Sequence, residues 1–143
     1  MRYLRRVIVF TILFVLPVFL YLKTASPTIN GYADSAELAT AAYKLWAAHP
    51  PGYPLFIFLG HLATKLPIGS VAFRLELFVA VMAAATVVLL YYLLRMFSNS
   101  GFLAAYGALI IGLSPAFWRY GHTVEVYALN MFFINLLLLV LMK

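Results

Sequence analysis

The sequence predicts an all-α, polytopic membrane protein with about four transmembrane helices and short interfacial helices in its first outer loop. Of the 143 residues, 66% are hydrophobic and only 10% are charged. A soluble domain has about 25% charged and 45–50% apolar residues, so water is not the main solvent of this chain. Apolar runs that approach the roughly 20 residues needed for one membrane-spanning helix recur along the sequence.

The first predicted span covers residues 4–22 and follows three arginines within the first six residues. Basic residues beside a first span usually remain in the cytoplasm, so we expect a cytoplasmic N-terminus. A secretory signal peptide is the alternative, because the basic start and apolar centre are followed by Ala25-Ser26. The net charge of +6 is thinly spread apart from this cluster, so we expect no nucleic-acid partner.

Residues 23–70 form the predicted first outer loop. The segment 35–46 has no Gly or Pro, and its larger apolar residues recur at helical spacing, which predicts an amphipathic interfacial helix. The sequence HPPGYP at residues 49–54 ends this helix with a rigid turn. The next apolar segment, 55–66, is too short to cross a bilayer and is predicted to be re-entrant or interfacial.

Three further spans are predicted at about residues 71–97, 101–118 and 124–142, and Ser70 can cap the first of them. With four spans, both ends of the chain lie on the inner side of the membrane. The whole chain is thus one membrane domain, 1–143. Because it ends directly after the fourth span, we expect it to be the N-terminal part of a longer protein.

The acidic residues gather on one side of the predicted membrane. A charge deep in a bilayer costs on the order of 2.5–3.5 kcal/mol on insertion scales, so a chain that keeps its few polar groups at one face indicates a site there. The predicted topology places all four at or near the outer face: Asp34, Glu37, Glu76 and Glu125.

Asp34 and Glu37 are three residues apart and would share one face of a helix that starts near Ser35. Such a pair can act as a general base with a helper carboxylate, or as half of a metal site. The alternative is a capping box, in which Asp34 caps the helix and Glu37 bonds back to it.

His122 and Glu125 are also three residues apart and could complete a metal site or hold a sugar hydroxyl. The alternative for Glu125 is an acidic residue favoured by the dipole of its own helix. Arg74 and Arg119 are candidates for binding a lipid phosphate, or else they extend to the lipid headgroups.

Five short segments stand out for their composition and order: DSAEL at 34–38, HPPGYPL at 49–55, GSVAFR at 69–74, SPAFW at 114–118 and EVYALN at 125–130. In this order they resemble the DUF2723 family of GT-C type membrane glycosyltransferases, which includes protein O-mannosyltransferases. The resemblance covers nearly the whole chain, and Ala36, where we expect glycine more often, leaves both carboxylates in place.

The resemblance implies an enzyme that transfers a sugar from a polyprenyl-phosphate carrier to a protein or glycan acceptor. It implies a bacterial inner membrane or endoplasmic reticulum location, with the active face outside or in the lumen. Asp34 would be the base, with Glu37 beside it. No cofactor is certain, and a divalent metal stays open. The candidate substrate-binding residues are His49, Tyr53, Arg74, Arg119, His122, Glu125 and Tyr127.

Two other classes of function stay open from the residues themselves. Proline-broken apolar segments beside polar residues are also typical of transporters and of lipid-binding membrane subunits. A structural subunit without chemistry is the third hypothesis, in which the carboxylates serve folding alone.

Overall fold

The computed structural model describes residues 2–25, 28–29 and 33–142, and among these residues every regular element is a helix. The predicted all-α class is confirmed. The elements are α1 (Arg2–Phe10), the π-helix η1 (Thr11–Val15), α2 (Leu16–Thr24), α3 (Ser35–Lys44), α4 (Pro54–Thr64), α5 (Val71–Phe97), α6 (Gly101–Gly112), α7 (Pro115–Gly121) and α8 (Tyr127–Leu141).

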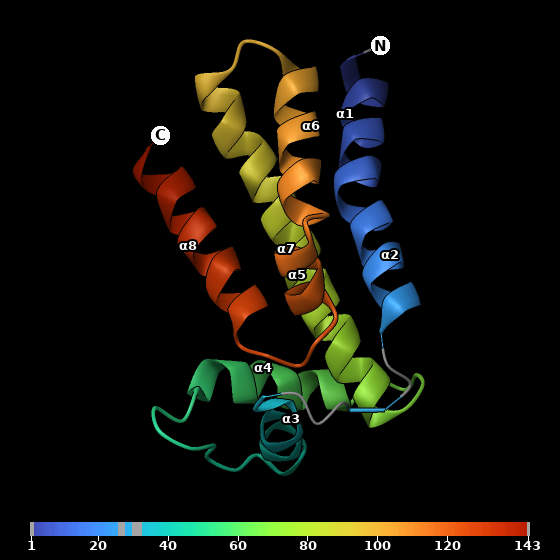
Figure 1. The fold of residues 1–143 in the computed structure, drawn as a ribbon, viewed down its shortest axis with the longest axis vertical. Coiled ribbons are helices and arrows are strands. Elements are labelled where there is room, and N and C mark those ends of the chain that lie inside the picture. The colour runs from blue at the N-terminus through green and yellow to red at the C-terminus, as the bar shows by residue number, and fades with distance from the viewer. Residues whose placement is uncertain (1, 26–27, 30–32, 143) are drawn as a thin grey trace.

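The helices form an elongated bundle with two helices lying across one end (Figure 1). The bundle consists of the α1–η1–α2 rod, α5, the α6–α7 pair and α8, and α5 contacts all the other members. The crossing helices are α3 and α4, and both chain termini lie at the opposite end (Figure 1). The segment predicted as the first outer loop therefore lies at the end of the molecule away from the two termini (Figure 1).

Within the part of the chain that the structure describes, two helices are long and apolar enough to cross a membrane, Val7–Thr24 and Val71–Phe97. A third span results if α6 and α7, which are bent by 70° relative to each other, are counted as one. The apolar helix α8 is shorter, with 15 residues. A fourth span over residues 124–142 therefore stays a prediction, as do the predicted boundaries and the orientation in the membrane.

The continuous span predicted over 101–118 is broken in the structure between α6 and α7. Ser114 has an extended backbone, with ψ 148°, directly before Pro115. A proline ring disfavours the helical conformation of the residue before it, so the chain cannot continue as one straight helix.

The first predicted span contains the π-helix η1, a feature that the apolar pattern does not reveal. The N–H of Leu16 donates to the carbonyl of Thr11, five residues back. Pro17 follows at once and has no N–H to donate to the preceding turn, which explains why the regular ladder is interrupted here. The helix nevertheless continues through Thr24, whereas Ser26 of the signal-peptide alternative lies outside the described residues.

Tyr21 joins the first rod to the α6–α7 pair. Its side chain is fully buried, and its hydroxyl donates to the carbonyl oxygen of Gly112 at 2.7 Å. A Cβ on Gly121 would lie 3.0 Å from the Tyr21 ring, so the missing side chain lets the ring pack directly against α7. These contacts fix the position of α7, which leads into the connection that carries Glu125.

The two segments predicted to be interfacial or re-entrant form helices close to their predicted bounds, α3 and α4. Ser70 caps α5 by accepting from the Phe73 N–H at 3.1 Å, which confirms the capping prediction. The α3 helix ends at Leu45, whose φ of 56° is left-handed, and α4 begins after Tyr53, whose φ of 44° is also left-handed. The chain between these two residues returns toward the start of α3 and brings His49 with it.

Candidate functional site

Four polar residues from the α3 end of the molecule form one cluster, which we call the polar cluster. His49 is its centre: its Nδ1 lies 3.0 Å from Glu37 Oε2, and its Nε2 lies 3.7 Å from Asp34 Oδ2. The Tyr53 hydroxyl lies 3.4 Å from the same Nε2. The Asp34 side chain is 50% exposed, so a molecule outside the protein can reach it. The structure therefore brings together Asp34, Glu37, His49 and Tyr53.

Glu37 holds the backbone and the side chain of His49 at the same time. The His49 backbone N–H donates to Glu37 Oε1 at 2.6 Å, while Nδ1 of the ring lies beside Oε2. A carboxylate accepts only, so this contact assigns the hydrogen to Nδ1 and leaves Nε2 directed at Asp34 and Tyr53. The arrangement orients the imidazole, as the carboxylate partner of a histidine does in many sites.

The contact with His49 also fixes the charge of Glu37. Donation from the His49 backbone N–H, followed by the ring contact, holds the pKa of the Glu37 carboxyl below its ordinary value of 4.5. The folded protein thus favours the ionised form. This contribution to stability is fully present above pH 4.5 and is lost as the pH falls through the lower, folded pKa.

We therefore expect Glu37→Gln to lower the thermal unfolding midpoint at pH 7 and to have a smaller effect in acid. Unfolding of the protein in detergent, followed by tryptophan fluorescence, measures this difference. The matched control is Thr40→Ala on the same helix, whose hydroxyl bonds to the Ala36 carbonyl and carries no charge. A difference for Glu37→Gln that is equally large at pH 7 and well below pH 4.5 would contradict the assignment.

The capping-box interpretation of Asp34 and Glu37 is wrong. The Asp34 side chain makes no capping hydrogen bond, and Glu37 bonds to His49 instead of turning back to Asp34. The start of α3 is capped from elsewhere: Glu125 Oε1 accepts from the Asp34 backbone N–H at 3.0 Å and from the Ser35 hydroxyl at 3.3 Å. Asp34 therefore keeps its carboxylate for the exposed side of the cluster.

Glu125 lies in the connection between α7 and α8 and is only 2% exposed. Glu125 precedes the N-cap Val126, so it does not lie in the first turn of α8, and its hydrogen bonds go to the N-terminus of α3. The predicted pairing with His122 is also not formed in the described part of the chain. The His122 Nδ1 instead lies 2.7 Å from the carbonyl oxygen of Trp118.

Tyr127, the first residue of α8, packs its ring against Tyr120 of α7, with the ring centroids 4.6 Å apart.

The two arginines predicted to bind a phosphate, Arg74 and Arg119, differ in their surroundings. Arg74 donates to three carbonyl oxygens of the α4–α5 turn, those of Thr64, Ile68 and Gly69, and its guanidinium is directed into that turn. Arg119 lies exposed on α7.

The polar cluster has the composition of a metal site. Asp34, Glu37 and His49 each offer one ligand atom, and these atoms lie within 4.8 Å of one another. Carboxylate oxygens and imidazole nitrogens suit divalent transition metals. The Glu37–His49 bonds already occupy part of this donor set, however, so a cation would have to replace them.

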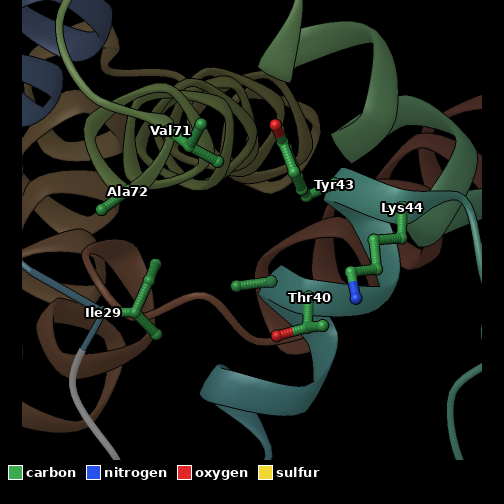
Figure 2. A pocket seen from close by; sticks show the side chains of 7 residues that line it. Ile29, Thr40, Tyr43, Lys44, Val71 and Ala72 are labelled. Carbon is green, nitrogen blue, oxygen red and sulfur yellow. The ribbon is translucent and has the colours of Figure 1, made fainter.

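A mostly apolar pocket of about 390 Å³ lies between α3, the helix that carries Glu37, and the first turn of α5. Side chains of α3 face Val71 and Ala72 of α5 across it, and Ile29 closes one end (Figure 2). Sequence reasoning missed this pocket, because it depends on how two separate helices pack. Its lining residues are Ile29, Ala39, Thr40, Tyr43, Lys44, Val71 and Ala72.

The fold and the polar cluster define a class: a helical membrane protein with a carboxylate–histidine site at one end of its bundle. Residues 34–143 match the family model described as the protein O-mannosyl-transferase TMEM260 N-terminal domain. The chain belongs to this family, which confirms the resemblance seen in the sequence. The match begins at Asp34 and includes every residue of the cluster.

Two curated relatives agree with this assignment. The chain is 41% identical over 106 residues to protein O-mannosyl-transferase TMEM260 of Mus musculus, covering 73% of this chain and 15% of the relative. It is 29% identical over 130 residues to protein O-mannosyl-transferase tmem260 of Dictyostelium discoideum, covering 89% of this chain and 16% of the relative. The chain thus spans less than a fifth of either relative. No solved structure matches it.

Proposed function

We propose that this chain forms the N-terminal, base-carrying part of a GT-C type membrane glycosyltransferase. The reaction is transfer of a sugar, mannose in view of the relatives' names, from a polyprenyl-phosphate carrier to a protein hydroxyl. The observation that carries the proposal is the cluster of Asp34, Glu37 and His49 at the end of the bundle away from the termini. The relatives named protein O-mannosyl-transferases support the reaction class.

Asp34 is the proposed general base. Its carboxylate takes the proton of the acceptor hydroxyl while that oxygen forms a bond to the anomeric carbon. The bond from this carbon to the phosphate oxygen breaks, and the polyprenyl phosphate leaves with the electron pair. Asp34 suits the role because its side chain is half exposed and does not cap α3.

His49 and Glu37 support Asp34 in this proposal. The Nε2 atom of His49 lies 3.7 Å from the Asp34 carboxylate, and Glu37 fixes the ring that carries it. Glu37 is therefore a positioning residue for His49, and its sequence-based assignment as a second catalytic carboxylate changes accordingly. The Tyr53 hydroxyl also lies beside the Nε2 atom of His49, at 3.4 Å.

A cationic side chain must balance the charge of the leaving phosphate. Arg74 already donates to three backbone carbonyls, so its use would require breaking those bonds. Arg119, which is exposed on α7, the helix that leads to the Glu125 connection, is the other candidate for this role. The proposed site faces the outer or lumenal side of the membrane, with the N-terminus in the cytoplasm.

A lipid-binding or transport function is the second candidate. The apolar pocket between α3 and α5 and the 70° bend between α6 and α7 favour it, because broken helices beside cavities are typical of transporters. This candidate predicts movement or retention of a lipid without any covalent change to it.

The two candidates are separated by one experiment on the whole protein in lipid vesicles. Labelled polyprenyl-phosphate mannose is added with a serine- and threonine-containing acceptor protein, and the label is followed in both. We expect label on the acceptor in a bond that survives denaturation. Redistribution of intact donor across the bilayer, with no labelled acceptor, would overturn the enzyme proposal in favour of transport.

A further inference from the structure

Glu125 connects two parts of the chain that are far apart in sequence. Its carboxylate Oε1 accepts from the Asp34 backbone N–H and the Ser35 hydroxyl, 91 and 90 residues away. The first of these donors belongs to the proposed base itself. No other contact described in the structure ties the α7–α8 connection to the start of α3 by hydrogen bonds.

The burial of Glu125 makes this contact specific. The residue is 2% exposed and Ser35 is fully buried, so water does not substitute easily for either partner. A buried carboxylate is retained where it is hydrogen-bonded, and the N-terminus of a helix is a favourable place for its charge. Such a residue is poorly placed to bind a substrate, because its Oε1 atom already accepts two hydrogen bonds and the side chain as a whole is buried.

We propose that Glu125 is a positioning residue: it caps α3 from across the fold and thereby sets the location of the Asp34 carboxylate. The inference rests on the proposed function, in which Asp34 is the base. It replaces the sequence-based assignment of Glu125 as a substrate-binding residue. Glu125 holds the Asp34 backbone through its N–H, while the Asp34 side chain makes no capping hydrogen bond and lies beside His49.

The same contact makes the proposed site depend on the α7–α8 connection. Movement of this connection would release the first turn of α3 and displace Asp34 from His49. A displacement of about 1 Å at a reacting group lowers a rate on the order of 100-fold. Substrate affinity would change little, since Glu125 does not contact the substrate.

The test compares four variants of the whole protein in membranes: Glu125→Ala, Glu125→Gln, Ser35→Ala and Thr123→Val. Thr123 is the matched control, because it is buried in the same connection and its hydroxyl bonds to the Arg119 carbonyl of α7, not to α3. Two readouts are used: kcat and KM for sugar transfer, and hydrogen exchange of the Asp34 amide. The second readout does not depend on activity.

We expect Glu125→Ala to lower kcat on the order of 100-fold with KM unchanged, and to speed exchange of the Asp34 amide. Glu125→Gln keeps an acceptor oxygen, so we expect the Asp34 amide to stay protected from exchange in this variant. Its kcat should fall by less than about 10-fold, since neutral hydrogen bonds are roughly half as strong as charged ones. The kcat of Ser35→Ala is expected to lie between the values of the two Glu125 variants. Thr123→Val is expected to leave both kcat and exchange of the Asp34 amide unchanged.

Three results would overturn the inference: unchanged exchange of the Asp34 amide in Glu125→Ala, a raised KM with normal kcat, or a Glu125→Gln variant as inactive as the alanine. If Glu125→Ala does not fold, the decision falls to the Gln variant and to Ser35→Ala, which must lower kcat without raising KM. Normal transfer by Asp34→Asn would refute the proposed function. Loss of transfer in Asp34→Asn, with normal Glu125→Ala, would refute this inference alone.

Discussion

We expect the replacement of Asp34 by Asn to lower the rate of sugar transfer strongly while the protein stays folded. A general base contributes about 10²- to 10⁴-fold to a rate, and an amide cannot take up the proton of the acceptor hydroxyl. We therefore expect kcat to fall by about that factor. Because the Asp34 side chain is half exposed and makes no capping bond, its loss removes little from the fold.

The control for this prediction is the thermal unfolding midpoint of Asp34→Asn, which we expect to stay close to that of the wild type. The backbone N–H of residue 34 is unchanged in the variant, so the bond to Glu125 persists. Normal kcat in this variant would refute Asp34 as the base. A strongly lowered midpoint would show that the carboxylate serves folding, as the structural-subunit hypothesis holds.

Substitution of Gly112 by Ala destabilises the bundle at the contact between α5 and α6. A Cβ at this position would lie 2.5 Å from Cγ2 of Val87, whose short side chain cannot move far. Overpacking of this kind costs about 1–3 kcal/mol. The same substitution presses on the site where Tyr21 donates to the Gly112 carbonyl, so the first rod is affected as well.

Gly107→Ala on the same helix is the matched control. Its Cβ would lie 3.1 Å from Cδ1 of Leu94, the far end of a flexible side chain that can turn aside. Alanine also favours the helix over glycine by roughly 0.5–1 kcal/mol. Unfolding of both variants in detergent should show a loss for Gly112→Ala and none for Gly107→Ala, whereas equal stability of the two would contradict the packing described here.

Much of the fold follows from the sequence because a lipid solvent leaves few choices. Backbone groups in a bilayer must be satisfied within the segment, so long apolar runs such as 71–97 form helices. Local signals also gave the Ser70 cap and the HPPGYP turn between α3 and α4. The break at Ser114-Pro115 was visible in the sequence as a proline, but its 70° angle depends on packing.

The candidate site was only partly predictable for a physical reason. The Asp34–Glu37 spacing located the carboxylates. A spacing of three residues, however, cannot distinguish a capping box from two carboxylates that both contact His49. The contact between Glu125 and the start of α3 spans 91 residues and leaves no periodic signal. The three carbonyls that surround Arg74 likewise come from a turn whose path is set in three dimensions.

Asp34, as the proposed base, removes the acceptor proton in a sugar transfer from a polyprenyl-phosphate carrier. Single-turnover transfer tests it most directly, with the wild type and Asp34→Asn each loaded with labelled donor before the acceptor is added. The account predicts that both proteins retain the donor and that only the wild type passes the label to the acceptor. Transfer by Asp34→Asn at the wild-type rate would contradict it.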